Sequence, residues 1–129
     1  MTKPDKRVVY FEDDFDMVEL VRIILGREGY QVDGVAEGQA GIKLIKEILP
    51  DAILLDLMLP DMDGWEIFRQ LKNDPSTAEI PVIVVTAKAQ SIDKVLGLEI
   101  AKVDDYISKP FRPDELVERV NLVLAANEQ

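Results

Sequence analysis

The sequence contains no cysteine and no histidine among its 129 residues. The absence of cysteine excludes disulfide bonds, thiolate nucleophiles and cysteine metal sites. The absence of histidine excludes a Ser-His-Asp triad, a histidine-ligated zinc and an imidazole base. Polar chemistry in this chain must therefore come from carboxylates, hydroxyls and lysines.

The sequence also lacks a long apolar run. No stretch approaches the roughly 18 apolar residues of a membrane span, and residues 1–7 lack the apolar core of a signal peptide. We therefore expect a cytoplasmic protein that has no membrane as a partner. The length suits one domain over residues 1–129, with residues 1–6 and 126–129 as loose ends.

Basic side chains are in the minority, because 25 acidic residues oppose 15 Lys and Arg residues and give a formal net charge of −10. Binding to a nucleic acid duplex requires clustered Lys and Arg that displace phosphate counterions. Direct binding of nucleic acid is therefore not expected. The acidity favours solubility in general, so the informative question is whether particular carboxylates converge.

Five short apolar runs, typical of strands, alternate with segments of helical period. The runs are residues 8–11, 30–35, 52–55, 82–85 and 106–107. Most are continuously apolar and rich in β-branched residues, as strands covered on both faces should be, whereas residues 30–35 are mixed and typical of an edge strand. The alternation predicts an α/β fold, a doubly wound parallel sheet of five strands with helices on both faces.

Apolar residues at helical spacing predict the first, second, third and fifth helices. The expected buried residues are Met17, Leu20, Val21, Ile24 and Leu25, then Leu44, Ile45, Ile48 and Leu49, then Ile67, Phe68 and Leu71, and finally Leu116, Val117, Val120, Val123 and Leu124. Asp63 with Glu66 predicts a capping box before the third helix, and Pro113 suits the first turn of the fifth. The fourth helix, at about residues 91–101, has the weakest signal because Gly97 lies in its middle.

Side chains capable of polar chemistry follow four of the five predicted strands. They are Glu12-Asp13-Asp14 after the first strand, Asp56 after the third, Thr86 after the fourth and Lys109 after the fifth. In an open α/β sheet, ligands bind at the carboxyl ends of the strands. Four strands that bring a carboxylate, a hydroxyl or an ammonium to the same edge predict a site there.

The residue types at this edge indicate a particular chemistry. Two carboxylates about 4 Å apart repel by roughly 4 kcal/mol at an effective dielectric constant near 20, so they require a cation or a shared proton. Mg²⁺ suits the site, because it prefers one or two carboxylates together with water and phosphate oxygens. A carboxylate beside Mg²⁺, the Lys109 ammonium and the Thr86 hydroxyl is prepared to attack phosphorus.

Taken singly, each of these residues also has an explanation that involves no site. Asp14 or Asp16 can cap the first helix, and we expect one of them to do so. Thr86 can simply end a strand, and Lys109 can be a surface lysine. Only the joint placement of these residues favours a functional interpretation.

Four stretches of the sequence carry a resemblance to a known family. They are Phe11-Glu12-Asp13-Asp14, residues 51–64 with Asp56 and Asp63-Gly64, residues 81–87 with Thr86-Ala87, and residues 105–111 with Lys109-Pro110-Phe111. In this order and spacing the chain resembles the receiver domain of bacterial two-component response regulators. The single-domain chemotaxis type is the most similar in layout, and its fold implies the strand order 2-1-3-4-5.

The resemblance implies a role for each matching residue. Asp56 resembles the phosphoacceptor. Glu12 and Asp13 resemble the acidic pair that binds Mg²⁺ together with Asp56 and the main-chain carbonyl of Met58. Thr86 and Lys109 resemble the residues that contact phosphoryl oxygens, and Thr86 and Tyr106 resemble a switch pair. Movement of the switch pair would reshape the surface of the fourth helix, fifth strand and fifth helix for a downstream partner. The Lys109-Pro110 bond resembles the cis peptide of the family.

The resemblance further implies a signalling protein that catalyses its own phosphorylation and dephosphorylation, and not a metabolic enzyme. The phosphoryl donor is expected to be a sensor histidine kinase or a histidine phosphotransfer protein, since this sequence has no histidine of its own. Phe15 and the exposed side of the first helix are candidates for docking that donor. Met58 and Lys88 occupy positions that tune the phosphoryl lifetime in the family. Residues 101–103, Ala-Lys-Val, depart from the small residues that often precede the Asp-Asp-Tyr stretch.

Other classes of protein fit the sequence less well. A haloacid-dehalogenase-type phosphatase needs a second Asp two residues after its nucleophile, where this chain has Met58. A flavodoxin-like FMN carrier needs a hydroxyl-rich phosphate loop after the first strand, where this chain has acids. A calcium loop around residues 61–64 fails because Leu59 and Gln70 stand at its first and last ligand positions. Two alternatives stay open: a receiver domain taken from a larger response regulator or hybrid kinase, and a docking module that works without phosphorylation.

Overall fold

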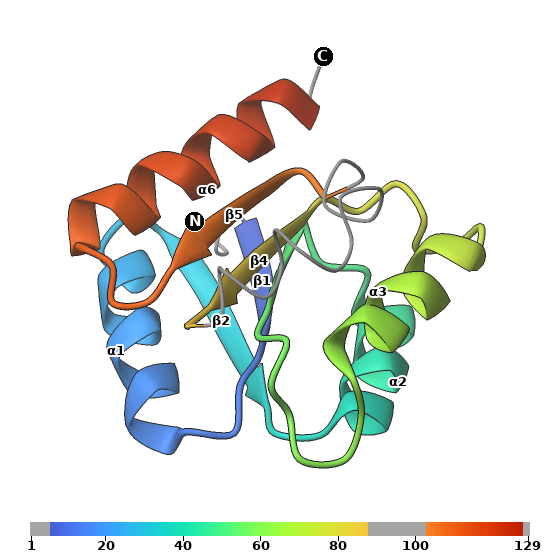
Figure 1. Cartoon of the computed structure of the whole chain (residues 1–129). Helices are drawn as coiled ribbons and strands as arrows, with labels where there is room; N and C mark the ends of the chain where they lie inside the picture. Colours follow the sequence, from blue (N-terminus) through green and yellow to red (C-terminus); the bar gives the residue numbers. More distant parts are fainter. Residues whose placement is uncertain (1–5, 88–102, 128–129) are drawn as a thin grey trace.

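The computed structural model describes residues 6–87 and 103–127. The strands are β1 (Lys6–Phe11), β2 (Tyr30–Val35), β3 (Ala52–Leu55), β4 (Val82–Thr86) and β5 (Asp105–Ser108). The helices are α1 (Phe15–Gly26), α2 (Gly38–Ile48), α3 (Gly64–Asn73) and α6 (Pro113–Asn127). All five predicted strands are present, and β1, β2, β3 and β5 are each followed by a helix (Figure 1).

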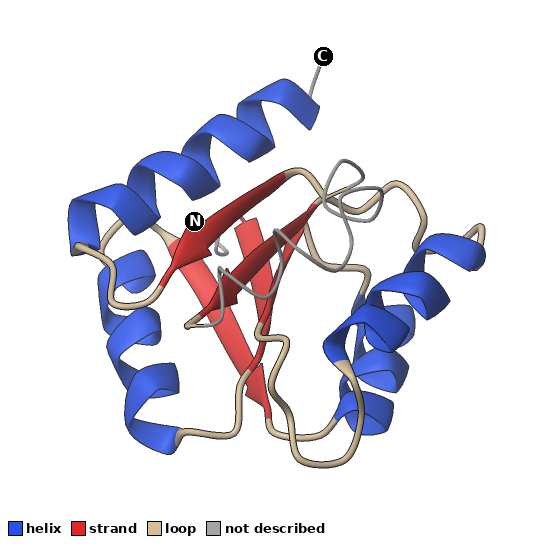
Figure 2. Ribbon diagram, in the orientation of Figure 1, coloured by secondary structure: helices blue, strands red, loops and turns tan. Residues whose placement is uncertain are grey.

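The five strands form one parallel sheet in the order β2-β1-β3-β4-β5, as predicted. β1 pairs with β2 on one side and with β3 on the other, so that Val8 lies opposite both Val32 and Ala52. The mixed strand β2 is an edge of the sheet, which confirms the prediction made from its composition. Figure 2 shows the sheet as a central layer with helices on both sides.

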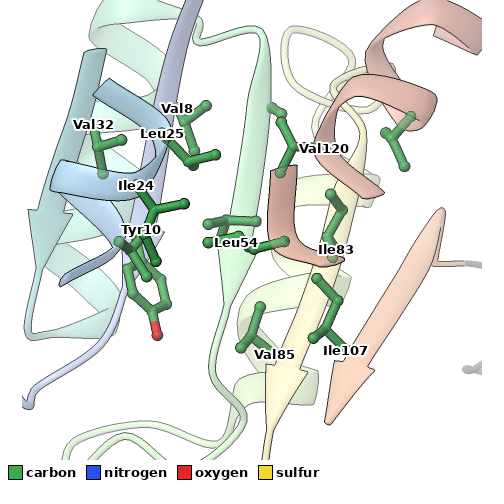
Figure 3. Close-up of a cluster of buried hydrophobic side chains, with 14 of the residues drawn as sticks. Val8, Tyr10, Ile24, Leu25, Val32, Leu54, Ile83, Val85, Ile107 and Val120 are labelled. Atoms are coloured by element: carbon green, nitrogen blue, oxygen red, sulfur yellow. The ribbon is translucent and has the colours of Figure 1, made fainter. Parts of the chain in front are cut away.

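Successive residues of the strands alternate between the two faces of the sheet. One face contributes Val8, Tyr10, Leu54, Ile83 and Val85 to a core shared with α1 and α6 (Figure 3). The other face contributes Val9, Phe11, Ile53, Leu55 and Val84 to a second core shared with α2 and α3. The strands are continuously apolar because both faces of the sheet are buried, as the sequence predicted.

The predicted buried face of the third helix is confirmed, and so is that of the last helix except for Val117, which is only partly buried. The predicted faces of the first two helices were partly wrong. In α1, Val21, Ile24 and Leu25 are buried as predicted. Leu20, however, is 45% exposed, and Val18, which was not predicted, is buried. In α2 the buried apolar residues are Ile42 and Ile45. Leu49 lies beyond the end of α2, with a positive φ of 48°, and is 53% exposed.

The expected loose ends were also partly wrong. Lys6 belongs to β1, and α6 continues to Asn127. The predicted fourth helix lies outside the described residues, as do Lys88 and the Ala-Lys part of residues 101–103. Within the described ranges, no helix combines the length and the apolar composition needed to cross a bilayer.

Side chains cap the helices that surround the carboxyl edge of the sheet. Asp14 caps α1 by accepting the N–H groups of Asp16 and Met17, so the predicted acidic cap is Asp14. Asp63 caps α3 by accepting the N–H of Trp65, whereas the Glu66 carboxylate accepts a hydrogen bond from Gln70.

The first turn of α2 is capped by a residue that is distant in sequence. Glu37, which directly precedes the helix, makes no side-chain capping bond. Instead, both carboxylate oxygens of Asp61 lie 3.0 Å from the Gly38 nitrogen. Asp61 belongs to the segment between β3 and α3, so this segment is attached to the start of α2.

The backbone of Gly64 packs against the segment that follows β3, so a larger residue at this position should lower stability. A Cβ atom on Gly64 would lie 2.5 Å from the Cα of Leu57, which is closer than two carbon atoms can approach without displacement of the backbone. We expect Gly64→Ala to lower the free energy of unfolding by about 2 kcal/mol, as overpacking typically does. Urea denaturation measures this change.

Gly26→Ala is the matched control at a helix end. A Cβ atom there would have no neighbour within 4 Å. We expect its stability to be unchanged or slightly raised, because alanine favours helix more than glycine does. Equal destabilisation by both substitutions would contradict a specific contact between Gly64 and Leu57.

Candidate functional site

The candidate site lies at the carboxyl edge of the sheet, and backbone hydrogen bonds position it. The Glu12 N–H donates to the Val35 carbonyl at 2.9 Å, and the Asp56 N–H donates to the Phe11 carbonyl at 3.1 Å. These bonds continue the pairing of the sheet one residue beyond the ends of β1 and β3. The segments after β1 and β3 therefore leave the same edge of the sheet, at the bottom of Figure 1.

Lys109 reaches the same edge from β5. Its N–H donates to the Thr86 carbonyl at 3.0 Å, which aligns the end of β5 with the end of β4. The Lys109-Pro110 peptide bond is cis, so the prediction from the family resemblance is confirmed.

The centre of the site is an ammonium group between two buried carboxylates. Lys109 Nζ lies 2.5 Å from Glu12 Oε1 and 2.7 Å from Asp56 Oδ2. The exposed fractions of these side chains are 17% for Lys109, 3% for Glu12 and 7% for Asp56. The structure thus brings together three residues that the sequence placed after three different strands.

Burial and hydrogen bonding set the charge states of this group. Burial raises the pKa of Asp56, although hydrogen bonds from Lys109 and from the Met58 N–H act in the opposite direction. Burial also disfavours the Lys109 ammonium, but its hydrogen bonds to Asp56 and Glu12 outweigh this effect and raise the pKa of Lys109. The ammonium therefore stays charged at neutral pH and serves as the internal cation of the site.

Each oxygen of Asp56 has a separate hydrogen-bond donor. The Met58 N–H donates to Oδ1 at 2.9 Å, and Lys109 donates to Oδ2. Met58, two residues after Asp56, is 56% exposed. Asp56 is consequently a carboxylate that is fixed at both of its oxygens.

Glu12 is held by three donors, two from its own stretch of chain and one from the end of β5. Oε1 accepts the Tyr10 hydroxyl at 3.0 Å as well as the Lys109 ammonium, and Oε2 accepts the Asp14 N–H at 3.0 Å. Burial, together with the Glu12 carboxylate, raises the pKa of Tyr10, so its hydroxyl keeps its proton and donates. The sequence analysis missed Tyr10, although a tyrosine two residues before Glu12 in an otherwise apolar strand was a usable signal, since residues i and i+2 share a face.

The other predicted site residues occupy different surroundings. Asp13 is exposed in the turn after β1. Thr86 is fully buried at the end of β4. Tyr106 is half-buried on β5 and packs against the core that contains α2 and α3. Thr86 lies at the same edge of the sheet as Lys109, because its carbonyl accepts the Lys109 N–H.

The number and type of the donor atoms at this edge determine which metal ion they could hold. Among residues 6–87 and 103–127, no group of three or more acidic side chains is spaced to hold a metal. Mg²⁺ does not require such a group, because it binds one or two carboxylates and completes its octahedron with water. Two buried carboxylates that already share a cation, next to the exposed Asp13, therefore fit a magnesium ion in their chemistry.

Comparisons with known proteins agree with this geometry. The DNA-binding response regulator MtrA of Mycolicibacterium smegmatis is 40% identical over 123 residues, which are 95% of this chain and 52% of MtrA. The chain therefore spans about half the length of the curated relatives that it matches. A putative response regulator from Chloroflexus aurantiacus superposes with a TM-score of 0.85 at 34% identity, covering 93% of this chain and 98% of that one.

A further solved structure bears on the metal. The receiver domain of the sensor histidine kinase PA1611 from Pseudomonas aeruginosa has a TM-score of 0.84 at 28% identity, with 93% of this chain and 98% of that one covered. That structure has a magnesium ion coordinated in its active site cleft. The response regulator receiver domain family matches residues 8–121 of the present chain. The chain belongs to this family of receiver domains, which are the phosphoryl-accepting switches of response regulators.

Proposed function

We propose that Asp56 is the phosphoryl acceptor of this receiver domain. The observation that supports this assignment is the placement of Asp56, a buried carboxylate whose two oxygens are fixed by the Met58 N–H and the Lys109 ammonium. A carboxylate held in this way is oriented before it meets its substrate, and orientation lowers the barrier to reaction. The charged ammonium beside it can stabilise the negative charge of an incoming phosphoryl group.

The donor is a phosphohistidine on a histidine kinase or a histidine phosphotransfer protein. One bond forms between an Asp56 oxygen and phosphorus while the bond between phosphorus and the donor's imidazole nitrogen breaks. The imidazole nitrogen keeps the electron pair and takes up a proton. Because this sequence contains no histidine, the donor must be another polypeptide or another part of a longer one. Phe15, which is 72% exposed at the start of α1, is the proposed contact for it.

Mg²⁺ is the proposed cofactor, held by Asp13, Asp56 and the Met58 carbonyl, with Glu12 acting through water. When bound, it supplies positive charge to the carboxylate and phosphoryl oxygens. The residues of the chain perform the remaining tasks. Lys109 neutralises the charge that arrives on Asp56, and Glu12 keeps its carboxylate beside the Lys109 ammonium.

Phosphorylation adds roughly 1.5 to 2 negative charges and three acceptor oxygens at Asp56. We propose that Thr86 and Lys109 bind these oxygens and that Tyr106 moves inward with Thr86. Thr86 and Tyr106 lie on neighbouring strands, where Val84 is the partner of Tyr106 in the register. The downstream partner would then bind the surface that includes β5 and α6. The charge at Asp56 biases a two-state equilibrium, and this is the physical basis of the switch.

Radiolabelled acetyl phosphate tests this function on the chain as it is. We expect Mg²⁺-dependent labelling that hydroxylamine removes, because an acyl phosphate is sensitive to hydroxylamine. Labelling in EDTA should fall to background, since the two carboxylates would then lack the ion that offsets the incoming charge.

Two outcomes would contradict the proposal in different ways. Equal labelling with EDTA and with Mg²⁺ would rule out the metal assignment. The absence of label under both conditions would instead favour a docking module that works without phosphorylation.

A further inference from the structure

Tyr10 differs from its neighbours in β1, because it combines a core position with a polar contact. It is fully buried in the core that contains α1 and α6. Figure 3 shows its ring among aliphatic side chains, with the hydroxyl oxygen pointing away from them. That oxygen donates to Glu12 Oε1 at 3.0 Å. A phenylalanine would fill the same core volume, so the hydroxyl adds only the bond to Glu12.

The bond matters because Glu12 Oε1 shares its other donor with Asp56. Lys109 lies within hydrogen-bonding distance of both carboxylates, at 2.5 Å from Glu12 and 2.7 Å from Asp56. Under the proposed function, a phosphoryl group on Asp56 attracts the ammonium. Of the two donors to Glu12 Oε1, the Tyr10 hydroxyl then remains, while the Asp14 N–H still donates to Oε2.

We propose that Tyr10 is a positioning residue that holds the Glu12 carboxylate in the orientation required for water-mediated Mg²⁺ binding. Tyr10 does not touch the ion or the phosphoryl group; it acts through Glu12. Partners that orient a ligand in this way strongly affect the affinity of metal sites. This inference rests on the proposed function, since it assigns Tyr10 a part in the same magnesium site.

Calorimetric titration with MgCl₂ measures the effect directly, without any phosphorylation assay. We expect Tyr10→Phe to raise the dissociation constant for Mg²⁺ about 10-fold, the lower end of the range for loss of such a partner. Tyr30→Phe is the matched control, because the Tyr30 hydroxyl donates to Asn121 on α6, away from the acidic residues. Its Mg²⁺ affinity should equal that of the unmodified chain.

A double-mutant cycle tests whether Tyr10 acts through Glu12. Glu12→Ala removes the carboxylate that Tyr10 orients, so adding Tyr10→Phe to this variant should change the dissociation constant less than about 2-fold. A purely structural role would lower the melting temperature in EDTA and leave Mg²⁺ affinity unchanged.

The possible failures are distinguishable. Unchanged Mg²⁺ affinity in Tyr10→Phe would overturn the positioning role and leave the proposed function intact. Full additivity of the two substitutions would overturn it as well, because Tyr10 would then act independently of Glu12. Absence of Mg²⁺ binding in the unmodified chain would overturn both the positioning role and the magnesium assignment.

Discussion

Replacement of Asp56 by asparagine is expected to reduce phosphoryl labelling to background. The amide nitrogen of asparagine is a poor nucleophile at neutral pH, and the substitution removes one of the two carboxylates that share Lys109. The side chain keeps its size, so the Met58 N–H retains an acceptor oxygen where Asp56 Oδ1 now lies. Gel autoradiography after incubation with radiolabelled acetyl phosphate and Mg²⁺ measures the loss.

The folded state of this variant serves as an internal control. Burial raises the pKa of Asp56, which means that the charged carboxylate is less favourable in the folded protein than in the unfolded one. Such a group lowers stability above its folded pKa, and the penalty disappears as the pH falls below the unfolded pKa. We therefore expect Asp56→Asn to melt at a temperature no lower than the unmodified chain at pH 7.

A second aspartate in the same sheet provides the matched comparison. Asp33 lies on β2 and pairs with Arg7 at 2.9 Å, outside the candidate site. Asp33→Asn should be labelled as fully as the unmodified chain. Hydroxylamine-sensitive label retained in Asp56→Asn would place the acceptor on another residue.

Replacement of Lys109 by methionine is expected to have the largest effect on stability. The substitution keeps the length of the side chain but leaves Glu12 and Asp56 buried without their shared cation. Removal of one partner from a buried ion pair typically costs about 3 kcal/mol. Urea denaturation at pH 7 in EDTA should show a loss of this size, and the variant should also fail to transmit a phosphorylation signal to its downstream partner.

The pH dependence of this effect follows from the two pKa shifts. The raised pKa of Lys109 means that its stabilising contribution is present below the unfolded pKa and is lost as the pH rises through the higher folded value. The raised pKa of Asp56 means that its penalty disappears as the pH falls through its folded pKa, which lies above the ordinary aspartate value. The difference in unfolding free energy between the unmodified chain and Lys109→Met should therefore be largest near neutral pH and smaller at low and high pH.

Lys46→Met is the control for loss of a lysine. Lys46 pairs with Asp74 at 3.3 Å, and its side chain is 49% exposed. Exposed pairs of this kind contribute about 0–1 kcal/mol, so the variant should unfold almost as the unmodified chain does. A similar loss from both substitutions, or a gap that does not depend on pH, would contradict the role of Lys109 as an internal cation.

The architecture was predictable because this sheet is buried on both faces. Runs such as residues 52–55 and 82–85 are continuously apolar, and that pattern is typical of parallel strands between two helical layers. The polar residues that interrupt the runs then mark the carboxyl edge. Glu12, Asp56 and Lys109 could be placed together by this rule alone.

Details that depend on tertiary packing were not predictable in the same way. In α1, a periodic pattern that includes either Val18 or Leu20 fits the sequence, and only the packing against β1 and β2 selects Val18. Leu49 continues the apolar period of α2, but the helix ends before it in a left-handed turn. Local periodicity does not encode which of two nearby apolar residues of a helix faces the core.

The hydrogen-bond network of the site was only partly predictable, for a related reason. The sequence indicates which residue types reach the edge of the sheet, but not which oxygen accepts from which donor. The Tyr10 hydroxyl and the Lys109 ammonium both donate to Glu12 Oε1, and this sharing depends on side-chain conformations that no sequence pattern specifies.

The cap that Asp61 provides to α2 has a consequence for how this sequence can vary. Position 61 serves two segments at once, since it belongs to the turn after Asp56 and also satisfies the first N–H of a separate helix. A loop transplanted from another receiver without an acid or amide at this place would leave that helix end unsatisfied, even if every residue around Asp56 were preserved. Substitutions in the turn and in the beginning of α2 are therefore expected to be interdependent, and an exchange of modules between related proteins should keep the two together.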